Sequence, residues 1–425
     1  MERKAEKIKA LTGMHDFLPE QTPAWQALEG AIREISRLYG YEEIRTPLLE
    51  ATGLFVRSIG EQTDVVGKEM YTFDDNGESV SLRPEGTASC LRAAVEANML
   101  REGPRKLYYV GPMFRHERPQ KGRYRQFSQY GVEALGFEGP DVDAEVVAMN
   151  RALFRKVGIQ DGELRLEINC LGNRAEREAF RSTLVSYLKS RESILDEDSR
   201  RRMLTNPLRV LDTKNPDLQE MCDAAPRLVD SLGPESRAHY AGFKALLAEM
   251  GIAYVENPRL VRGLDYYDLT VFEWVTEELG SQSTVLGGGR YNGLVGELGG
   301  RDAPGVGFAL GMDRLMLLLE KKGLNAPRLA PDVYFAWLCP EALGGAMRLA
   351  EALRRQGLSA LVHAGGGKAK NQFQKADKSG ALFAVALGPD ELASGKATLK
   401  DLRGDKGQIV VAQDGLAQAI EQWKS

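Results

Sequence analysis

The sequence has few of the residues that build metal sites and disulfides. Its four cysteines and four histidines are scattered over 425 residues, and none matches a metal-ligand spacing. No apolar run is long enough to span a membrane. The first residues, MERKAEKIKALTGMHDF, contain no apolar core of a secretory signal. We therefore expect a cytoplasmic protein with free thiols, no metal ligands and no membrane partner.

Neither sign of charge dominates the chain. Lys and Arg number 56 against 60 Asp and Glu, for a net charge of −4. This balance excludes a generally basic nucleic-acid binder but is compatible with local basic patches. Hydrophobic residues make up 43% and charged residues 27%, as in ordinary globular proteins. The length predicts roughly two to four domains.

A polar hairpin is predicted near the middle of the first half of the chain. Residues 106–114 and 125–135 are rich in aromatic and β-branched residues, and Pro119 and Gly122 lie in the turn between them. Side chains alternate between the two faces of a strand. One face then combines charged, amide and aromatic side chains with two glycines: Tyr109, Gly111, Met113, Arg115, Arg125, Phe127, Gln129, Gly131 and Glu133. Such a face suits a charged small molecule. The alternative is an edge hairpin with a solvated face.

Two helix starts are predicted before this hairpin. Thr22 as N-cap and Pro23 at the first position predict a helix that ends at Gly40. Glu85 and Thr87 lie between a strand at 79–83 and a helix at 88–101. Their position suits either a helix cap or a binding site. A further helix is predicted over 143–157.

The second half begins with charged helical segments and then returns to strands. Residues 170–257 read as a helical insertion, and DLTVFEWV (268–275) reads as a strand. Three glycines at 287–289 favour a glycine-rich hairpin turn over a phosphate loop, because no Gly-Lys-Ser/Thr follows. Arg314 falls in the first turn of a helix, where a cation opposes the dipole. An anionic partner is therefore expected, either a ligand or a surface carboxylate.

The pattern divides the chain into five parts. They are a first domain in two parts, 1–169 and 258–325, the helical insertion 170–257, a linker 326–331 and a C-terminal α/β domain 332–425. In the last of these, four lysines lie near Phe373 and a glycine run: Lys368, Lys370, Lys375 and Lys378. Basic residues beside an aromatic suit RNA, and a generic solvated surface explains them too.

Five motifs in order resemble the class II aminoacyl-tRNA synthetases, and within them the histidyl-tRNA synthetase family. GYEEIRTPLLE (40–50), FRHERPQKGRYRQFSQYGVE (114–133) and GVGFALGMDRLMLL (305–318) are similar to the three class II signatures. LVRGLDYY (260–267) and GGGRYNGL (287–294) are similar to the two histidine-specific ones. The resemblance implies an α+β fold: an antiparallel sheet flanked by helices, a helical insertion, and a C-terminal anticodon-binding domain.

The resemblance also implies site residues. Histidine would be bound by Glu85, Gly86, Thr87, Gln129, Glu133, Arg262, Tyr266 and Tyr267. ATP, with Mg²⁺, would be bound by Arg115, Glu117, Arg123, Phe127 and Arg314. Arg115 and Arg262 would stabilise the charge on the transferring phosphorus, because a guanidinium fork holds phosphate bidentately. Arg118 and Gln120 would contact the acceptor end of tRNA(His), and the first motif would form a homodimer.

Two positions depart from the family pattern. Asn292 stands where aspartate is usual, which would remove a charge near the histidine pocket, and Asp313 is shorter than the glutamate often found. Two other functions are compatible with the fold: a non-catalytic paralogue that senses histidine or tRNA, and a synthetase for another amino acid. Arg115, Arg123 and Arg314 favour the enzyme over the sensor, and Arg262 with Glu133 favours histidine.

Overall fold

The chain folds as two units, Met1–Ala326 and Pro327–Ser425, each described here by itself. The computed structural model describes residues 7–61, 63–213, 215–264, 266–280, 284–324 and 330–424. Positions 326–329 of the predicted linker lie outside these residues. No helix within the described ranges is long and apolar enough to cross a membrane.

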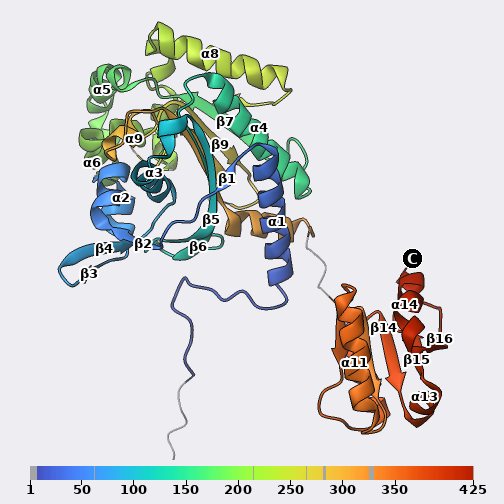
Figure 1. Ribbon diagram of the computed structural model, residues 1–425. Coiled ribbons are helices and arrows are strands. Elements are labelled where there is room, and N and C mark those ends of the chain that lie inside the picture. The colour runs from blue at the N-terminus through green and yellow to red at the C-terminus, as the bar shows by residue number, and fades with distance from the viewer. Residues whose placement is uncertain are drawn as a thin grey trace, which may run out of the picture. The chain divides into compact units, whose positions relative to one another are not determined.

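A largely antiparallel sheet forms the centre of the first unit (Figure 1). Its strand order is β1-β5-β6-β11-β10-β9-β7-β8, with β1–β5 and β7–β8 parallel. The strands are β1 (Glu42–Glu43), β5 (Arg105–Phe114), β6 (Gln126–Leu135), β7 (Arg165–Cys170), β8 (Val255–Glu256), β9 (Asp268–Val275), β10 (Thr284–Arg290) and β11 (Gly305–Gly311). A smaller sheet contains β2 (Leu49–Ala51), β3 (Thr72–Asp75) and β4 (Glu78–Leu82). The predicted α+β class with an antiparallel sheet is confirmed.

The predicted hairpin is the pair β5–β6, and its register agrees with the predicted faces. Tyr109 lies opposite Gly131, and Gly111 lies opposite Gln129. The other face carries Tyr130 and Val132, both fully buried in the larger hydrophobic core. The polar and apolar faces of the hairpin therefore follow directly from the alternation of its side chains.

Helices cover both faces of this sheet. In Figure 1, α1 and α4 lie on one side of it, and α2, α3 and α9 lie on the other. The helices of the unit are α1 (Thr22–Leu38), α2 (Thr52–Ile59), α3 (Thr87–Glu96), α4 (Pro140–Lys156), α5 (Arg174–Lys189), α6 (Glu197–Thr205), α7 (Gln219–Asp223), α8 (Pro234–Glu249), α9 (Leu294–Glu297) and α10 (Met312–Lys321). Helices α5 to α8 account for most of the segment 170–257, which the sequence predicted to be helical. The first helix begins at Thr22 with Gln21 at the N-cap position, so the predicted cap at Thr22 is wrong by one residue.

The glycine run at 287–289 lies inside strand β10, which corrects the prediction of a hairpin turn. These glycines pair with β9 on one side and with β11 on the other. A Cβ at Gly288 would lie 2.3 Å from the Gly307 carbonyl oxygen and 2.7 Å from the Phe272 ring. The reason for glycine is therefore the close approach of neighbouring groups in the middle of a sheet.

The second unit is an α/β domain around a five-stranded sheet of order β13-β12-β14-β15-β16. Its strands are β12 (Val333–Trp337), β13 (Ala360–Val362), β14 (Phe383–Leu387), β15 (Lys396–Asp401) and β16 (Gln408–Ala412). Its helices are α11 (Ala342–Arg355), α12 (Ala369–Lys378), α13 (Pro389–Ser394) and α14 (Leu416–Lys424). The C-terminal domain is therefore of the α/β class, as predicted.

Candidate active site

A cleft of about 500 Å³ opens on the polar face of the β5–β6 hairpin. It contains most of the predicted site residues: Glu85, Thr87, Arg115, Glu117, Arg123, Phe127, Gln129, Arg262, Tyr266, Tyr267 and Arg314. Four predicted residues, Gly86, Glu133, Arg118 and Gln120, do not line it. The sheet, the start of α3, the β5–β6 loop and the start of α10 thus converge on one cavity.

The arginine-rich end of the cleft is built by the loop between β5 and β6. Arg115 donates from Nε to the Pro84 carbonyl at 2.8 Å, and its guanidinium lies 5.5 Å from the centre of the Phe127 ring. Arg123 and Glu117 form an ion pair of 2.8 Å. The result is a cationic wall beside an aromatic ring, which is suited to a nucleotide.

Arg314 reaches this wall from helix α10. It donates to the carbonyl oxygens of Gly122 at 3.2 Å and Thr284 at 2.6 Å. Burial, with the positive charges of Arg123 and Arg115 nearby, lowers the pKa of Arg314. Several cations held together in this way favour an anionic ligand between them.

Arg262 occupies the middle of the cleft and is tightly held. It forms an ion pair with Glu273 on β9, whose other carboxylate oxygen accepts a hydrogen bond of 2.7 Å from the Thr284 hydroxyl. The guanidinium lies over Gly287, where a Cβ would be 2.3 Å from Nη1. Its buried Nε donates to no partner among the described residues. Arg262 therefore lines the cleft and has one buried donor without a partner among the described residues.

Glu85 combines the two roles left open for it. Its carboxylate accepts the backbone N–H groups of Thr87 at 2.7 Å and Ala88 at 2.9 Å, at the start of α3, and it also lines the cleft. Burial raises the pKa of this carboxyl above its ordinary value. Gly86 lies behind it against Tyr109, whose ring would be 2.1 Å from a Cβ at that position.

Gln129 has an unsatisfied acceptor at the cleft. The side chain is buried, and its Oε1 accepts no hydrogen bond within the part of the chain that the structure describes. A buried amide oxygen without a partner costs free energy. A ligand N–H would remove that cost.

Glu133 lies behind the cleft lining. It accepts hydrogen bonds from Tyr291 and, at 3.1 Å, from Tyr109. Burial raises the pKa of its carboxyl to about 8. It is therefore a buried acid within a tyrosine cluster, since the rings of Tyr266 and Tyr291 also lie 5.7 Å apart.

The β5–β6 loop carries the predicted tRNA contacts away from the cleft. Gln120 and Arg123 form a small antiparallel bridge that closes the tip of the loop. Arg118 and Gln120 are exposed. The two residues are thus on the outer side of a loop whose inner side forms the cationic wall.

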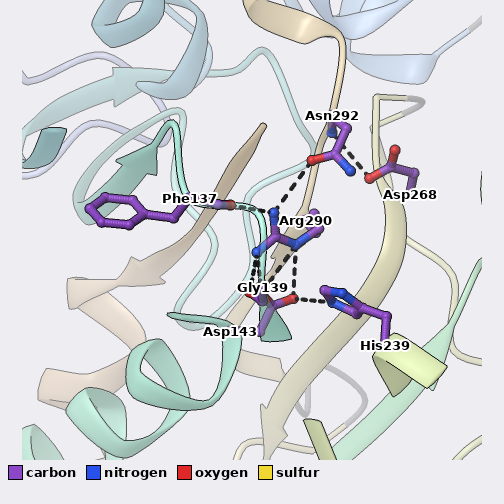
Figure 2. Close-up of polar contacts among 7 residues, drawn as sticks. All are labelled: Phe137, Gly139, Asp143, His239, Asp268, Arg290 and Asn292. Carbon is purple, nitrogen blue, oxygen red and sulfur yellow. Dashed lines mark hydrogen bonds and ion pairs between the residues drawn. The ribbon is translucent and has the colours of Figure 1, made fainter. Parts of the chain in front are cut away.

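Asn292, expected near the histidine pocket, does not line the cleft. Figure 2 shows it beside Arg290 and Asp268: its amide oxygen is 3.5 Å from Arg290 Nη1, and its backbone N–H donates to Asp268 at 3.1 Å. The strand end turns Tyr291 inward and leaves Asn292 exposed. Asp313, the other departure, lines the cleft and accepts the Ser128 N–H at 2.7 Å.

Arg290 is the centre of a separate buried network behind the sheet (Figure 2). It pairs with Asp143 on α4 and donates to the carbonyl oxygens of Phe137 at 2.7 Å and Gly139 at 2.8 Å. Asp143 also lies 3.3 Å from His239 Nε2 on α8. His239 and Arg290 together hold the pKa of Asp143 below its usual range, despite its burial. The network ties two helices to the end of β10.

Sequence reasoning missed four residues that the structure places at or beside the site. They are Tyr109, Glu273, Thr284 and Tyr291. Tyr109 was on the predicted polar face of the hairpin, and Glu273 is a lone acid inside an otherwise apolar strand. Those two signals were available in the sequence. The pairing of Glu273 with Arg262 and of Tyr291 with Glu133 could not be predicted, because these residues come together only in the folded chain.

An antiparallel sheet with an arginine-rich cleft, followed by an α/β unit, is the architecture of class II aminoacyl-tRNA synthetases. Family models agree with this fold. Residues 13–315 match the model of histidyl-tRNA synthetase, and residues 332–423 match the anticodon binding domain. The chain belongs to the histidyl-tRNA synthetase family.

Known relatives match over the whole chain. The chain is 59% identical over 430 residues to the histidine–tRNA ligase of Neisseria meningitidis serogroup C, covering 99% of this chain and 100% of that protein. It is 56% identical to the histidine–tRNA ligase of Laribacter hongkongensis, with 98% and 99% covered. The crystal structure of apo histidyl-tRNA synthetase from S. aureus is similar, with a TM-score of 0.82, 37% identity, and 98% and 100% of the two chains covered.

Proposed function

We propose that this chain is an aminoacyl-tRNA synthetase that activates L-histidine with ATP and transfers it to tRNA(His). The observation that carries the proposal is a single cleft that the arginine wall, Tyr266 and Tyr267 all line, with the tyrosine cluster around the buried Glu133 behind it. The wall suits a triphosphate and the cluster suits a small polar amino acid. Identity of 59% to a histidine–tRNA ligase over 99% of the chain supports the same activity.

ATP would lie along the arginine wall. Phe127 would stack on the adenine, and Glu117 would bind the adenine side of the nucleotide. Arg115 would hold the α-phosphate, while Arg123 and Arg314 would hold the outer phosphates. Each of these side chains faces the same cavity, and guanidinium groups suit phosphate because they stay charged and bind it bidentately.

Histidine would occupy the tyrosine-lined end. Its ammonium group would meet Glu85, Thr87 and the free oxygen of Gln129. Its carboxylate would meet Arg262, whose buried Nε has no hydrogen-bond partner among the described residues.

The imidazole would lie between the two neighbouring residues Tyr266 and Tyr267 and the buried acid. Glu133 would accept the imidazole N–H as part of the hydrogen-bonded group it forms with Tyr109 and Tyr291. Gly86 would make room for the Tyr109 ring. Buried polar groups that need an N–H partner reject analogues without one, by ~10⁴ to 10⁵ in the best cases.

The reaction needs no nucleophile from the protein. A carboxylate oxygen of histidine attacks the α-phosphorus of ATP, the bond to the β-phosphate oxygen breaks, and pyrophosphate leaves. The terminal ribose hydroxyl of tRNA then attacks the acyl carbon, and AMP leaves. Arg115 and Arg262 would stabilise the charge on the α-phosphate during the first step and position both substrates.

Magnesium would enter with the triphosphate. The described residues contain no group of three or more His, Cys, Asp or Glu side chains able to hold a metal ion. We expect Mg²⁺ to be bound mainly by phosphate oxygens and water. Glu273, which lines the cleft, is already paired with Arg262. Bound magnesium would neutralise charge on the phosphates.

The tRNA, dimer and cellular assignments extend this proposal. Arg118 and Gln120, exposed on the β5–β6 loop, would contact the acceptor end of the tRNA. The second unit would bind the anticodon, which agrees with its family model. The segment 40–50 would form a homodimer interface, and the protein would work in the cytoplasm. The domain limits would be those predicted, with 170–257 as the insertion.

One experiment tests the function against the sensor alternative. Purified protein is given histidine, ATP and labelled pyrophosphate, and then bulk tRNA. We expect ATP–pyrophosphate exchange that depends on histidine, followed by charging of tRNA. Histidine binding in calorimetry without exchange would instead support a non-catalytic paralogue. Exchange driven by another amino acid would reassign the substrate.

A further inference from the structure

The segment Leu11–His15, here called the N-terminal strap, lies across the base of the β5–β6 loop. The Gly13 carbonyl oxygen accepts the backbone N–H groups of Arg125 at 2.7 Å and Gln126 at 3.4 Å. Gly13 is buried although Leu11 and His15 on either side of it are exposed. A buried backbone group in an otherwise exposed segment indicates a specific docking point.

Only glycine fits at the centre of the strap. Gly13 has φ +82°, and a Cβ there would lie 2.9 Å from Arg125 Cγ and 3.0 Å from Pro119 Cγ. Both the backbone conformation and the lack of space exclude a side chain. The strap and the loop thus meet backbone to backbone.

The strap makes a second contact two residues later. The rings of His15 and Tyr124 have centroids 4.3 Å apart at an angle of 61°. Tyr124 lines the cleft next to Arg123. An edge-to-face ring pair adds to the docking and limits the rotation of the tyrosine.

Both contacts lead directly to the arginine wall. Arg125 donates from Nε to the Glu117 carbonyl at 3.1 Å, and its own carbonyl accepts the Arg115 N–H at 2.9 Å. On its other side the loop touches α10, where Arg314 donates to the Gly122 carbonyl at 3.2 Å. The loop is therefore held from one side by a residue of the wall and from the other by the strap.

We propose that the N-terminal strap is part of the nucleotide site, with Gly13 and His15 as positioning residues that hold the β5–β6 loop in its ATP-binding arrangement. Neither residue lines the cleft. Gly13 acts through Arg125, and His15 acts through Tyr124. The inference rests on the proposed function in one respect, namely that the loop binds ATP.

The test compares four full-length variants: Gly13→Val, His15→Ala, His15→Phe and, as a matched control, Asp16→Asn. ATP–pyrophosphate exchange is measured with ATP and histidine varied in turn. For Gly13→Val we expect the KM for ATP to rise about tenfold, the change that loss of one well-placed hydrogen bond produces. The KM for histidine should stay within about twofold. His15→Ala should show a smaller rise in the same parameter, and His15→Phe and Asp16→Asn should resemble the parent.

A second measurement does not depend on catalysis. Lys121 is exposed near the tip of the loop, so trypsin cleavage after it reports how firmly the loop is held. Gly13→Val and His15→Ala should be cleaved faster there, and Asp16→Asn should not. An unchanged KM for ATP, or a parallel rise in both KM values, would overturn the proposal, as would unchanged cleavage.

The two proposals fail in distinguishable ways. If the parent protein shows no exchange with histidine, the proposed function fails. The strap is then judged by calorimetric ATP binding and by cleavage after Lys121. Weaker ATP binding and faster cleavage in Gly13→Val support it, and no change in both refutes it.

Discussion

Replacing Arg262 by alanine should separate catalysis from stability. Arg262 has an ion-pair partner, Glu273, and a buried Nε that no described residue binds. The ion pair with Glu273 stabilises the fold, and the unpartnered Nε is proposed to bind the substrate. Alanine removes both, so the variant should lose activity and also leave a carboxylate without its cation.

The two losses have different sizes. Losing a group that stabilises charge in the transition state costs about 10²–10³ in kcat, or about 2.7–4 kcal/mol. Breaking a buried ion pair by removing one partner costs about 3–5 kcal/mol. The Glu273 side chain is 15% exposed and keeps the Thr284 hydroxyl at 2.7 Å. We therefore expect the lower end for unfolding, about 3 kcal/mol.

A double-mutant cycle tests this separation. Arg262→Ala, Glu273→Gln and the double variant are compared by urea unfolding and by pyrophosphate exchange. In the double variant the unpaired charge is gone, so stability should recover while exchange stays low. Arg155→Ala, which breaks an exposed pair with Asp161, serves as a control and should change neither. Folded Arg262→Ala with exchange within about threefold of the parent would refute the role of this arginine.

Three other predictions follow from burial and space. Because the pKa of Glu133 rises from 4.5 to about 8 on burial, this residue favours folding most at low pH and its contribution is lost as pH rises through that window. The difference in free energy of unfolding between Glu133→Gln and the parent should therefore shift in favour of the variant as pH rises from 5 to 9, as measured by urea unfolding. A difference that does not change with pH would contradict the raised pKa of Glu133. Asp143→Asn removes the carboxylate that pairs with the buried Arg290 guanidinium, so it should lower the free energy of unfolding by about 3–5 kcal/mol. Asp161→Asn, in an exposed pair with Arg155, should lower it by about 0–1 kcal/mol. Equal losses for the two variants in urea unfolding would argue against the network. Gly288→Ala would place Cβ 2.3 Å from the Gly307 carbonyl oxygen and should prevent folding. Gly344→Ala lies in helix α11, where the new Cβ meets no neighbouring group within 4 Å, and should stabilise the fold by about 0.5–1 kcal/mol. Circular dichroism and thermal melts measure both effects, and a folded Gly288→Ala or a destabilised Gly344→Ala would contradict them.

The hairpin shows how far local pattern reaches. Alternation alone placed Tyr109, Gly111 and Gln129 on one face of β5–β6, and the register in the structure agrees. A two-residue period along a strand is a local property, so no knowledge of distant residues was needed. The same holds for the helix of residues 22–38, whose apolar spacing was visible although its cap was misplaced by one residue.

The glycine run and Asn292 show where local pattern fails. Three glycines look like a turn when their neighbours in space are unknown. Gly288 nevertheless lies in a central strand, where it must be glycine because Gly307 and Phe272 leave no room for a side chain. At the end of the same strand, Asn292 is exposed, while its neighbour Tyr291 is buried and donates a hydrogen bond to Glu133. Both positions depend on which distant groups come close, and spacing along the chain does not encode that.

From the sequence we predicted the class of the fold and eleven of the residues that line the cleft. The hairpin faces follow from short-range periodicity, and the site residues follow from motifs that resemble those of a known family. Three pairs became visible only in the folded chain: Arg262 with Glu273, Glu133 with Tyr291, and Gly13 with Arg125. Each pair joins different strands or loops, and such contacts form only when the sheet brings those elements together.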